Sequence, residues 1–200
     1  MTFAAVLGAV GFWVLWRGAN LLAAALTVAG LAFYVAVYTA WLKRTTPQNI
    51  VIGGAAGAVP PLAAWAAATG RLELPALLLF AVVFLWTPPH FWALSMNLKD
   101  DYAAARIPML PVVRGEEETA RQVFWYTVAT VLSTLLVAPA AGLGWLYGAS
   151  AVVLGVEFVR RAWHLWRGSG QTAWAVYRYS LAYLALLFGA MVADRFVVGV

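Results

Sequence analysis

The stretch that decides the fold is residues 74–98, LPALLLFAVVFLWTPPHFWALSMNL, which contains no aspartate, glutamate, lysine or arginine. A helix needs roughly 20 mostly apolar residues, about 17–25 in practice, to cross the hydrocarbon core of a bilayer. The 25 residues of this stretch meet that requirement. They predict a membrane-spanning helix, and the rest of the chain shows the same character.

The composition of the whole chain is that of a membrane protein. Of its 200 residues, 64% are hydrophobic and 10% are charged, and the mean hydropathy is +0.82. Typical soluble domains are about 45–50% apolar and about 25% charged. This excludes a soluble enzyme, a disordered protein and a nucleic-acid-binding domain, so no nucleic acid partner is expected. The absence of cysteine also excludes disulfides, thiolate nucleophiles and cysteine-ligated metals.

Windows free of charged residues predict the number of membrane helices. The 122–156 window is too long for one straight span, and we divide it at the pair of glycines Gly142 and Gly144. The predicted fold is an all-α integral membrane protein, one domain over 1–200, with a bundle of about seven transmembrane helices. They are expected near 2–16, 20–41, 49–69, 73–96, 121–141, 144–162 and 174–197.

Basic residues predict the orientation in the membrane. With seven helices, ten of the thirteen lysines and arginines fall on the side of the N-terminus, and three fall on the other side. Cytoplasmic loops carry an excess of basic residues. We therefore expect the N-terminus and the polar chemistry on the cytoplasmic side and the C-terminus outside. Eleven of the thirteen are arginine, a bias typical of GC-rich bacterial genomes, so the expected location is a bacterial inner membrane. The ten are Lys43, Arg44, Lys99, Arg106, Arg114, Arg121, Arg160, Arg161, Arg167 and Arg178.

An adjacent pair of carboxylates lies in the only long predicted loop, near 97–120. The pair is Asp100–Asp101, in the run Asn97-Leu-Lys99-Asp-Asp-Tyr102. Mg²⁺ is commonly held by one or two carboxylates together with substrate phosphates and water. The sequence therefore suggests a metal-diphosphate site at the membrane surface, and an ordinary solvated loop is the alternative interpretation.

Two basic residues on the same side, Lys43 and Arg44, end the second predicted helix. Cationic side chains of this kind form charge-assisted hydrogen bonds with phosphate oxygens. The alternative is that they only fix the topology.

The third candidate is His90, in the run WTPPHFW at 86–92. An ionisable residue inside a membrane helix is costly, so a functional role is the first hypothesis for it. At helical spacing His90, Leu94, Asn97 and Asp101 share one face. They predict a polar stripe that runs inward from the carboxylates. The alternative is a packed histidine that is hydrogen-bonded to a neighbouring carbonyl.

Two further features are interpreted as structural. Gly53 and Gly57 form a GxxxG face for close helix packing. The acidic run at 116–118 follows Gly115 and is expected to open a helix, where negative charge suits the positive end of the helix dipole.

Taken together, these segments resemble the protohaem IX farnesyltransferase family, a branch of the intramembrane aromatic prenyltransferase superfamily. The resemblance covers nearly the whole chain. The runs PPHFW and PMLPV are typical of the haem-modifying branch, and the aspartate pair is similar to the second aspartate motif of the superfamily. The matching segments are Tyr38–Thr39, Lys43–Arg44, Thr46–Pro47, NIVIGG at 49–54, GAVPP at 57–61, WTPPHFWAL at 86–94, KDDY at 99–102 and IPMLPVV at 107–113.

The resemblance implies a reaction and a set of site residues. Members of the family transfer a farnesyl group from farnesyl diphosphate to a vinyl carbon of haem b, with addition of water, and give haem O and diphosphate. Mg²⁺ is the implied metal, held by Asp100 and Asp101. The implied diphosphate contacts are Lys43, Arg44 and Lys99. Tyr38, Asn49, Asn97 and Tyr102 are expected to bind substrate, and His90 is expected to contact haem as axial ligand or acid–base group. A haem A synthase or a terminal oxidase assembly is an expected downstream partner.

The chain departs from the family at its N-terminal end. The family typically has nine helices and a first aspartate motif between its second and third helix. Here no aspartate precedes Asp100. We therefore expect a form that lacks the first two helices and has little activity by itself. Alternatives are a quinone-pathway prenyltransferase of the same superfamily and a non-enzymatic haem-binding membrane fragment.

Overall fold

The computed structural model describes residues 2–198, and every regular element in that range is a helix. The prediction of an all-helical membrane protein is confirmed. The N-terminal elements are α1 (Thr2–Gly18), α2 (Leu21–Ala32), the π-helix η1 (Phe33–Leu42), α3 (Lys43–Thr45) and α4 (Asn49–Thr69). They are followed by α5 (Leu74–Asn97), α6 (Lys99–Ala104), α7 (Leu110–Ala141), α8 (Trp145–Trp166) and α9 (Ala173–Val198).

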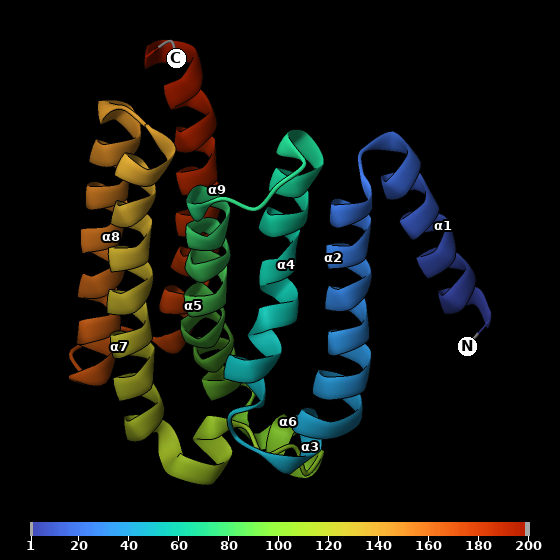
Figure 1. Ribbon diagram of the computed structural model, residues 1–200. Coiled ribbons are helices and arrows are strands. Elements are labelled where there is room, and N and C mark those ends of the chain that lie inside the picture. The colour runs from blue at the N-terminus through green and yellow to red at the C-terminus, as the bar shows by residue number, and fades with distance from the viewer. Residues whose placement is uncertain (1, 199–200) are drawn as a thin grey trace.

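Five helical segments in the described range are long and apolar enough to cross a membrane. They are Leu21–Thr45, in which α2, η1 and α3 form one rod, Asn49–Thr69, Leu74–Asn97, Leu110–Ala141 and Ala173–Val197. α1 is apolar but has only 17 residues, and α8 carries the charged residues Glu157, Arg160 and Arg161. These two long helices complete the bundle in Figure 1.

α5 lies at the centre of the bundle. It packs against α4 on one side and against α7 and α9 on the other, while α8 closes the group formed with α7 and α9. α1 packs against α2 and has no buried residue in the described part of the chain. Large apolar side chains such as Trp13, Leu132 and Val153 lie on the outside. This distribution suits a protein whose solvent is lipid.

The expected loop at 97–120 is partly helical, and the helix expected near 121–141 begins earlier, at Leu110. Pro111 lies in its first turn. Backbone N–H groups in the first turn have no intrahelical acceptor, so a proline, which lacks the N–H, is well tolerated there. Gly115 then interrupts the helix with a φ of 81°, a left-handed conformation that side chains other than glycine seldom adopt. The acidic run at 116–118 directly follows this bend, so it opens the long straight part of α7.

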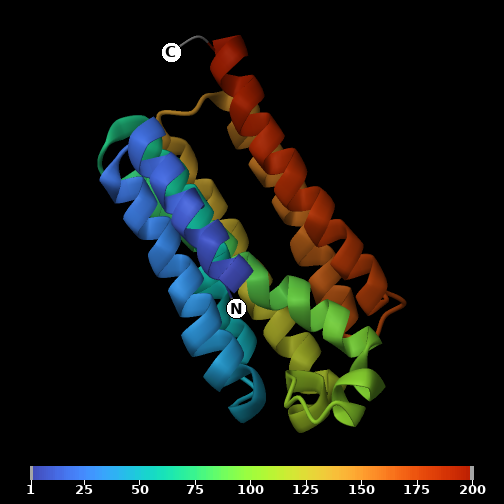
Figure 2. The ribbon, with the colours of Figure 1, turned by 90° about the vertical axis from the view of Figure 1, so that its right-hand side faces the viewer.

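The two ends of the bundle differ in charge. Figures 1 and 2 place α3 and α6 at one end and the C-terminal end of α9 at the opposite end. The first end therefore carries Lys43, Arg44 and Lys99, and the opposite end carries Arg195.

We predict that the end with α3 and α6 faces the cytoplasm. A reporter inserted after Arg71 should be active on the outside of the inner membrane, and a reporter within residues 103–106 should be active in the cytoplasm. The physical reason is that basic loops are retained on the cytoplasmic side during insertion. Alkaline phosphatase and green fluorescent protein fusions measure the two sides. The opposite pattern would place the end with α3 and α6 outside the cytoplasm and contradict the prediction.

Candidate functional site

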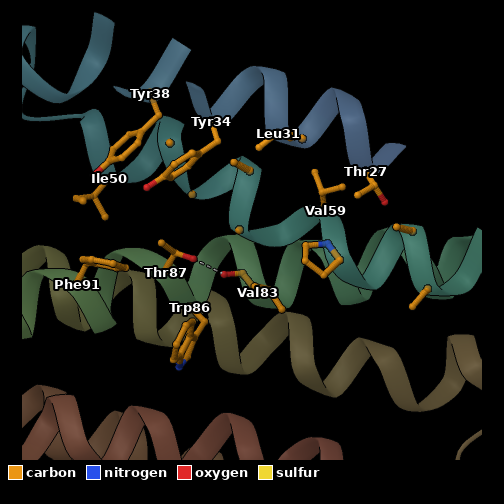
Figure 3. Close-up of a pocket in the computed structure, with 18 of the residues that line it drawn as sticks. Thr27, Leu31, Tyr34, Tyr38, Ile50, Val59, Val83, Trp86, Thr87 and Phe91 are labelled. Atoms are coloured by element: carbon orange, nitrogen blue, oxygen red, sulfur yellow. Dashed lines mark hydrogen bonds between the residues drawn. The ribbon is translucent and has the colours of Figure 1, made fainter. Parts of the chain in front are cut away.

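A large cavity lies between α2, η1, α4 and α5 (Figure 3). Its volume is about 680 Å³, within the range of about 300–1,000 Å³ that is usual for small-molecule sites. Its lining is almost entirely apolar. The residues drawn in Figure 3 include Thr27, Leu31, Tyr34, Tyr38, Ile50, Val59, Val83, Trp86, Thr87 and Phe91.

The cavity exists because α4 presents small residues to it. Gly53, Gly54, Gly57 and several alanines of α4 lie along the wall. A Cβ atom on Gly53 would lie 2.3 Å from Cδ2 of Tyr38, so that glycine provides the close packing that the GxxxG pattern predicts. A Cβ atom on Gly57 would meet nothing within 4 Å. Gly57 therefore contributes empty space to the cavity rather than a helix contact.

Two tyrosines enter the cavity from the π-helical segment. Tyr34 and Tyr38 lie on η1 with ring centroids 5.4 Å apart, and both project toward α4 in Figure 3. π-helical turns are rare and occur frequently at functional sites. Tyr38, which the resemblance implies as a substrate contact, thus has a place in the cavity wall.

The charged site residues lie at the end of the bundle that holds α3 and α6. Lys43 and Arg44 belong to α3, and Asp100 and Asp101 form the first turn of α6 with both side chains exposed. No hydrogen bond or ion pair joins these two groups within residues 2–198. The structure brings the predicted basic and acidic residues to one end without direct contact between them.

The aspartate pair fits only part of a Mg²⁺ site. Two exposed carboxylates offer oxygen ligands of the kind that Mg²⁺ takes, with the other positions left for water and phosphate oxygens. Among the described residues no cluster of three or more histidine, cysteine, aspartate or glutamate side chains could hold a metal. Asp100 and Asp101 are adjacent and exposed, so they can supply two oxygen ligands, and the remaining ligands would have to come from elsewhere.

Three of the other predicted contacts have defined partners. Lys99 Nζ lies 3.1 Å from Oε1 of Glu116, and Asn97 Nδ2 donates to the carbonyl of Ala93 at 2.7 Å. Tyr102 is half-buried and packs against the core. A diphosphate would have to compete with Glu116 for the lysine.

Asn49 differs from these residues because part of its side chain has no partner. It is fully buried at the start of α4, and its Nδ2 donates to the carbonyl of Lys43 at 3.4 Å. Its Oδ1 has no hydrogen-bond partner among the described residues. A buried acceptor without a donor is costly. Asn49 can therefore accept a hydrogen bond from a bound molecule or a water next to Lys43.

His90 does not line the large cavity. It lies between α5 and α9, where its Nδ1 is 2.7 Å from Oγ of Ser180. The imidazole is stacked between Trp86, at 4.3 Å, and Tyr177, at 4.7 Å between ring centroids. No described residue hydrogen-bonds to Nε2. The ring is thus held in a fixed orientation with one nitrogen left for another partner.

The expected polar stripe from Asp101 to His90 is wrong as a helix face. α5 ends at Asn97, and Leu98 has the non-helical angles φ −115° and ψ 26° before α6 begins. Helical spacing therefore cannot be extended from His90 to Asp101. The pair of prolines at 88–89 does not end α5, which continues through both of them.

The sequence interpretation missed most of the cavity wall. Tyr34, Trp86 and Phe91 line the cavity, and none of them was a candidate. Tyr34 carried a weak signal because it precedes Tyr38 by one helical turn. Trp86 and Phe91 flank His90 in the quoted run and could have been weighed with it.

Comparisons with known proteins agree on one family. The chain matches the UbiA prenyltransferase family over residues 1–188. It is 52% identical over 197 residues to a protoheme IX farnesyltransferase of Thermosynechococcus vestitus, with 96% of this chain and 62% of the relative covered. It is 50% identical over 194 residues to the protein of the same name from Gloeobacter violaceus, with 96% and 64% covered. No solved structure gives a significant match.

The match covers nearly all of this chain but only part of each relative. A protoheme IX farnesyltransferase of Roseiflexus is 55% identical over 192 residues, which are 96% of this chain and 36% of the relative. The chain spans between about a third and two thirds of the curated relatives named here. The family match covers nearly the whole chain, so the chain belongs to the UbiA prenyltransferase family.

Proposed function

We propose that this chain takes part in the transfer of a farnesyl group from farnesyl diphosphate to a vinyl group of haem b, giving haem O. The observation that carries the proposal is an apolar cavity of about 680 Å³ in a chain with carboxylates and cations at one end of its bundle. The names of the relatives support it, since those described above are protoheme IX farnesyltransferases.

The apolar wall suits the farnesyl chain. Tyr34, Tyr38 and Phe91 offer aromatic surface, and Gly57 leaves space beside them. An apolar enclosure also keeps bulk water from the allylic carbon once its bond to the diphosphate oxygen breaks. The proposed role of the cavity is to bind the chain and shield the reactive carbon until the vinyl group attacks it.

The charged residues act on the leaving diphosphate. Mg²⁺, when bound by Asp100 and Asp101, would neutralise charge on the diphosphate as the carbon–oxygen bond breaks. Lys43 and Arg44 would bind the same oxygens, and Lys99 would join them after leaving Glu116. Groups aimed at charge that develops in the transition state lower the barrier more than groups that bind only the ground state.

On the acceptor side, a vinyl carbon of haem b forms the new bond to farnesyl. The cation that results takes up a hydroxyl group from water, and the water gives up a proton. His90 is our candidate for contact with haem, because Ser180 fixes its Nδ1 and no described residue bonds Nε2.

Formation of haem O tests the proposal. Because the chain spans only part of its relatives, the assay needs two forms: the chain alone, and a graft in which it replaces the 197 residues that it matches in the Thermosynechococcus protein. Membranes with each form receive haem b, farnesyl diphosphate and Mg²⁺, and haem O is quantified by chromatography and mass spectrometry. An aromatic acid in place of haem b tests the quinone-pathway alternative.

We expect haem O from the graft and at least roughly tenfold less from the chain alone. One exposed carboxylate pair gives Mg²⁺ few of the oxygen ligands that it requires. Equal rates would show that the pair at 100–101 suffices by itself. No haem O from the graft, or prenylation of the aromatic acid, would contradict the proposed reaction.

A pair of variants separates two roles for His90. In the graft, His90→Ala should raise the KM for haem b by roughly tenfold, a loss of about 1.4 kcal/mol, and leave the KM for farnesyl diphosphate within about twofold. Ser180→Ala, which frees the ring without removing it, should have a smaller effect in the same direction. A purely structural histidine would lower the melting temperature in both variants and change neither KM.

A further inference from the structure

A second, smaller cavity lies between the α3–α4 connection, α5 and α7. Its volume is about 180 Å³, and it shares no lining residue with the large cavity. Its polar lining residues are Gln48, Trp92, Arg114, Glu118, Gln122 and Tyr126. A cavity of this size is too small for a porphyrin or a farnesyl chain. It can hold a few waters, at about 30 Å³ each, or one small polar group.

The indole N–H of Trp92 has no partner in this region. Trp92 is 1% exposed, packs edge-on against Tyr126 with ring centroids 5.3 Å apart, and lines the cavity. Its Nε1 has no hydrogen bond among the described residues. An indole nitrogen can only donate. The group missing at this position is therefore an acceptor.

The cavity is lined by one cation, Arg114, and one carboxylate, Glu118, whose nearest cation is Arg121 outside the lining. Glu118 is compensated by Arg121, at 2.7 Å, and also accepts a hydrogen bond from Gln122 at 2.8 Å. Arg114 lines the cavity and has no carboxylate within 4.0 Å in residues 2–198. The bend at Gly115 separates Arg114 from the straight part of α7, and the charge of Arg114 acts on Glu118 only at longer range than an ion pair.

We propose that this cavity binds one singly charged oxyanion, which accepts from Trp92 Nε1 and from the Arg114 guanidinium. The amide groups of Gln48 and Gln122 complete its surroundings. The phosphodiester of a phospholipid has this charge, and basic pockets between helices on the cytoplasmic side bind lipid head groups. Free phosphate or a carboxylate shares the same chemistry and is the other source.

Lipid binding to the purified chain tests the proposal. Native mass spectrometry of the detergent-solubilised protein would compare phosphatidylglycerol with diacylglycerol, which lacks the phosphate. A second arm would measure the melting temperature with inorganic phosphate and no added lipid, since a ligand of the folded state raises it. The variants are Trp92→Phe and Arg114→Gln. The first keeps an aromatic ring but lacks the indole N–H donor, and the second removes the positive charge. Arg106→Gln is the matched control, because Arg106 is exposed at the same end and lies outside the cavity.

We expect phosphatidylglycerol to bind in preference to diacylglycerol, with affinity at least roughly tenfold lower in Trp92→Phe and Arg114→Gln and unchanged in Arg106→Gln. Stabilisation by inorganic phosphate that both variants lose would support the site with a free anion as its source. Arg114 is exposed, so Arg114→Gln keeps the test valid if Trp92→Phe unfolds. Equal binding of lipid by the wild type and Arg114→Gln, together with no stabilisation by phosphate that Arg114→Gln loses, would overturn the proposal and leave a cavity that holds water.

Discussion

Asp101→Asn in the graft should lower the rate of haem O formation by about 10²–10³-fold, the usual cost of one electrostatic contact to a developing charge. Asparagine keeps the shape of the side chain but lacks the negative charge that a divalent cation requires. Asp101 is exposed in the first turn of α6, so the fold should remain assembled. The measurement is the initial rate at saturating haem b and farnesyl diphosphate, over a range of Mg²⁺ concentrations.

Glu117→Gln is the control for this experiment. Glu117 is also acidic, exposed and close to the same end of the bundle, and it forms no ion pair with the described residues. Its substitution should leave the rate unchanged within about twofold. If Glu117→Gln and Asp101→Asn lower the rate equally, the effect comes from general charge at this end and not from a metal ligand.

Gly57→Phe should reduce haem O formation in the graft by roughly 100-fold, about 2.7 kcal/mol at 1.36 kcal/mol for each factor of ten. Position 57 lines the cavity and a Cβ there meets no atom within 4 Å, so we expect a phenylalanine side chain to occupy part of the space that we assign to farnesyl. We expect the helix to keep its position, because no neighbouring atom obstructs the Cβ. The loss should appear in kcat/KM for farnesyl diphosphate.

Gly148→Phe provides the matched control for the blocked cavity. Gly148 lies within α8, a Cβ there also meets nothing within 4 Å, and the residue does not line the large cavity. It should leave kcat/KM unchanged. A Gly57→Phe protein that remains as active as the wild type would show that the farnesyl chain lies elsewhere.

Much of the fold could be predicted from apolar length and charge position. Segments such as 49–69 and 74–98 are predicted well because a membrane helix must satisfy its own backbone hydrogen bonds over a fixed length. The early start of α7 was missed because Leu110 to Arg114 form a short helical turn before Gly115. Hydropathy cannot distinguish a loop from one turn of helix over these five residues. The bend at Gly115, which divides this turn from the rest of α7, is visible only in the backbone angles.

The sequence predicted that the charged candidates share one end of the bundle, but it did not predict the contacts of each candidate. Lys43, Arg44, Asp100 and Asp101 reach one end of the bundle, as the topology requires. The position of His90 was not predictable, because a helix wheel gives the face of a residue and not the neighbour on that face. Its partner Ser180 belongs to α9 and is 90 residues away along the chain.

The claim that the farnesyl chain lies between α2, α4 and α5 is tested most directly by photo-crosslinking. A farnesyl diphosphate analogue with a diazirine near the end of its chain would be activated in membranes that contain the graft, and the modified residues would be identified by peptide mass spectrometry. We expect labels within Asn49–Thr69 and on Tyr34 or Phe91, and we expect them to be lost in Gly57→Phe and when unmodified farnesyl diphosphate is in excess. Labels that map to the groove between α8 and α9, around Val153 and Leu186, would contradict the claim.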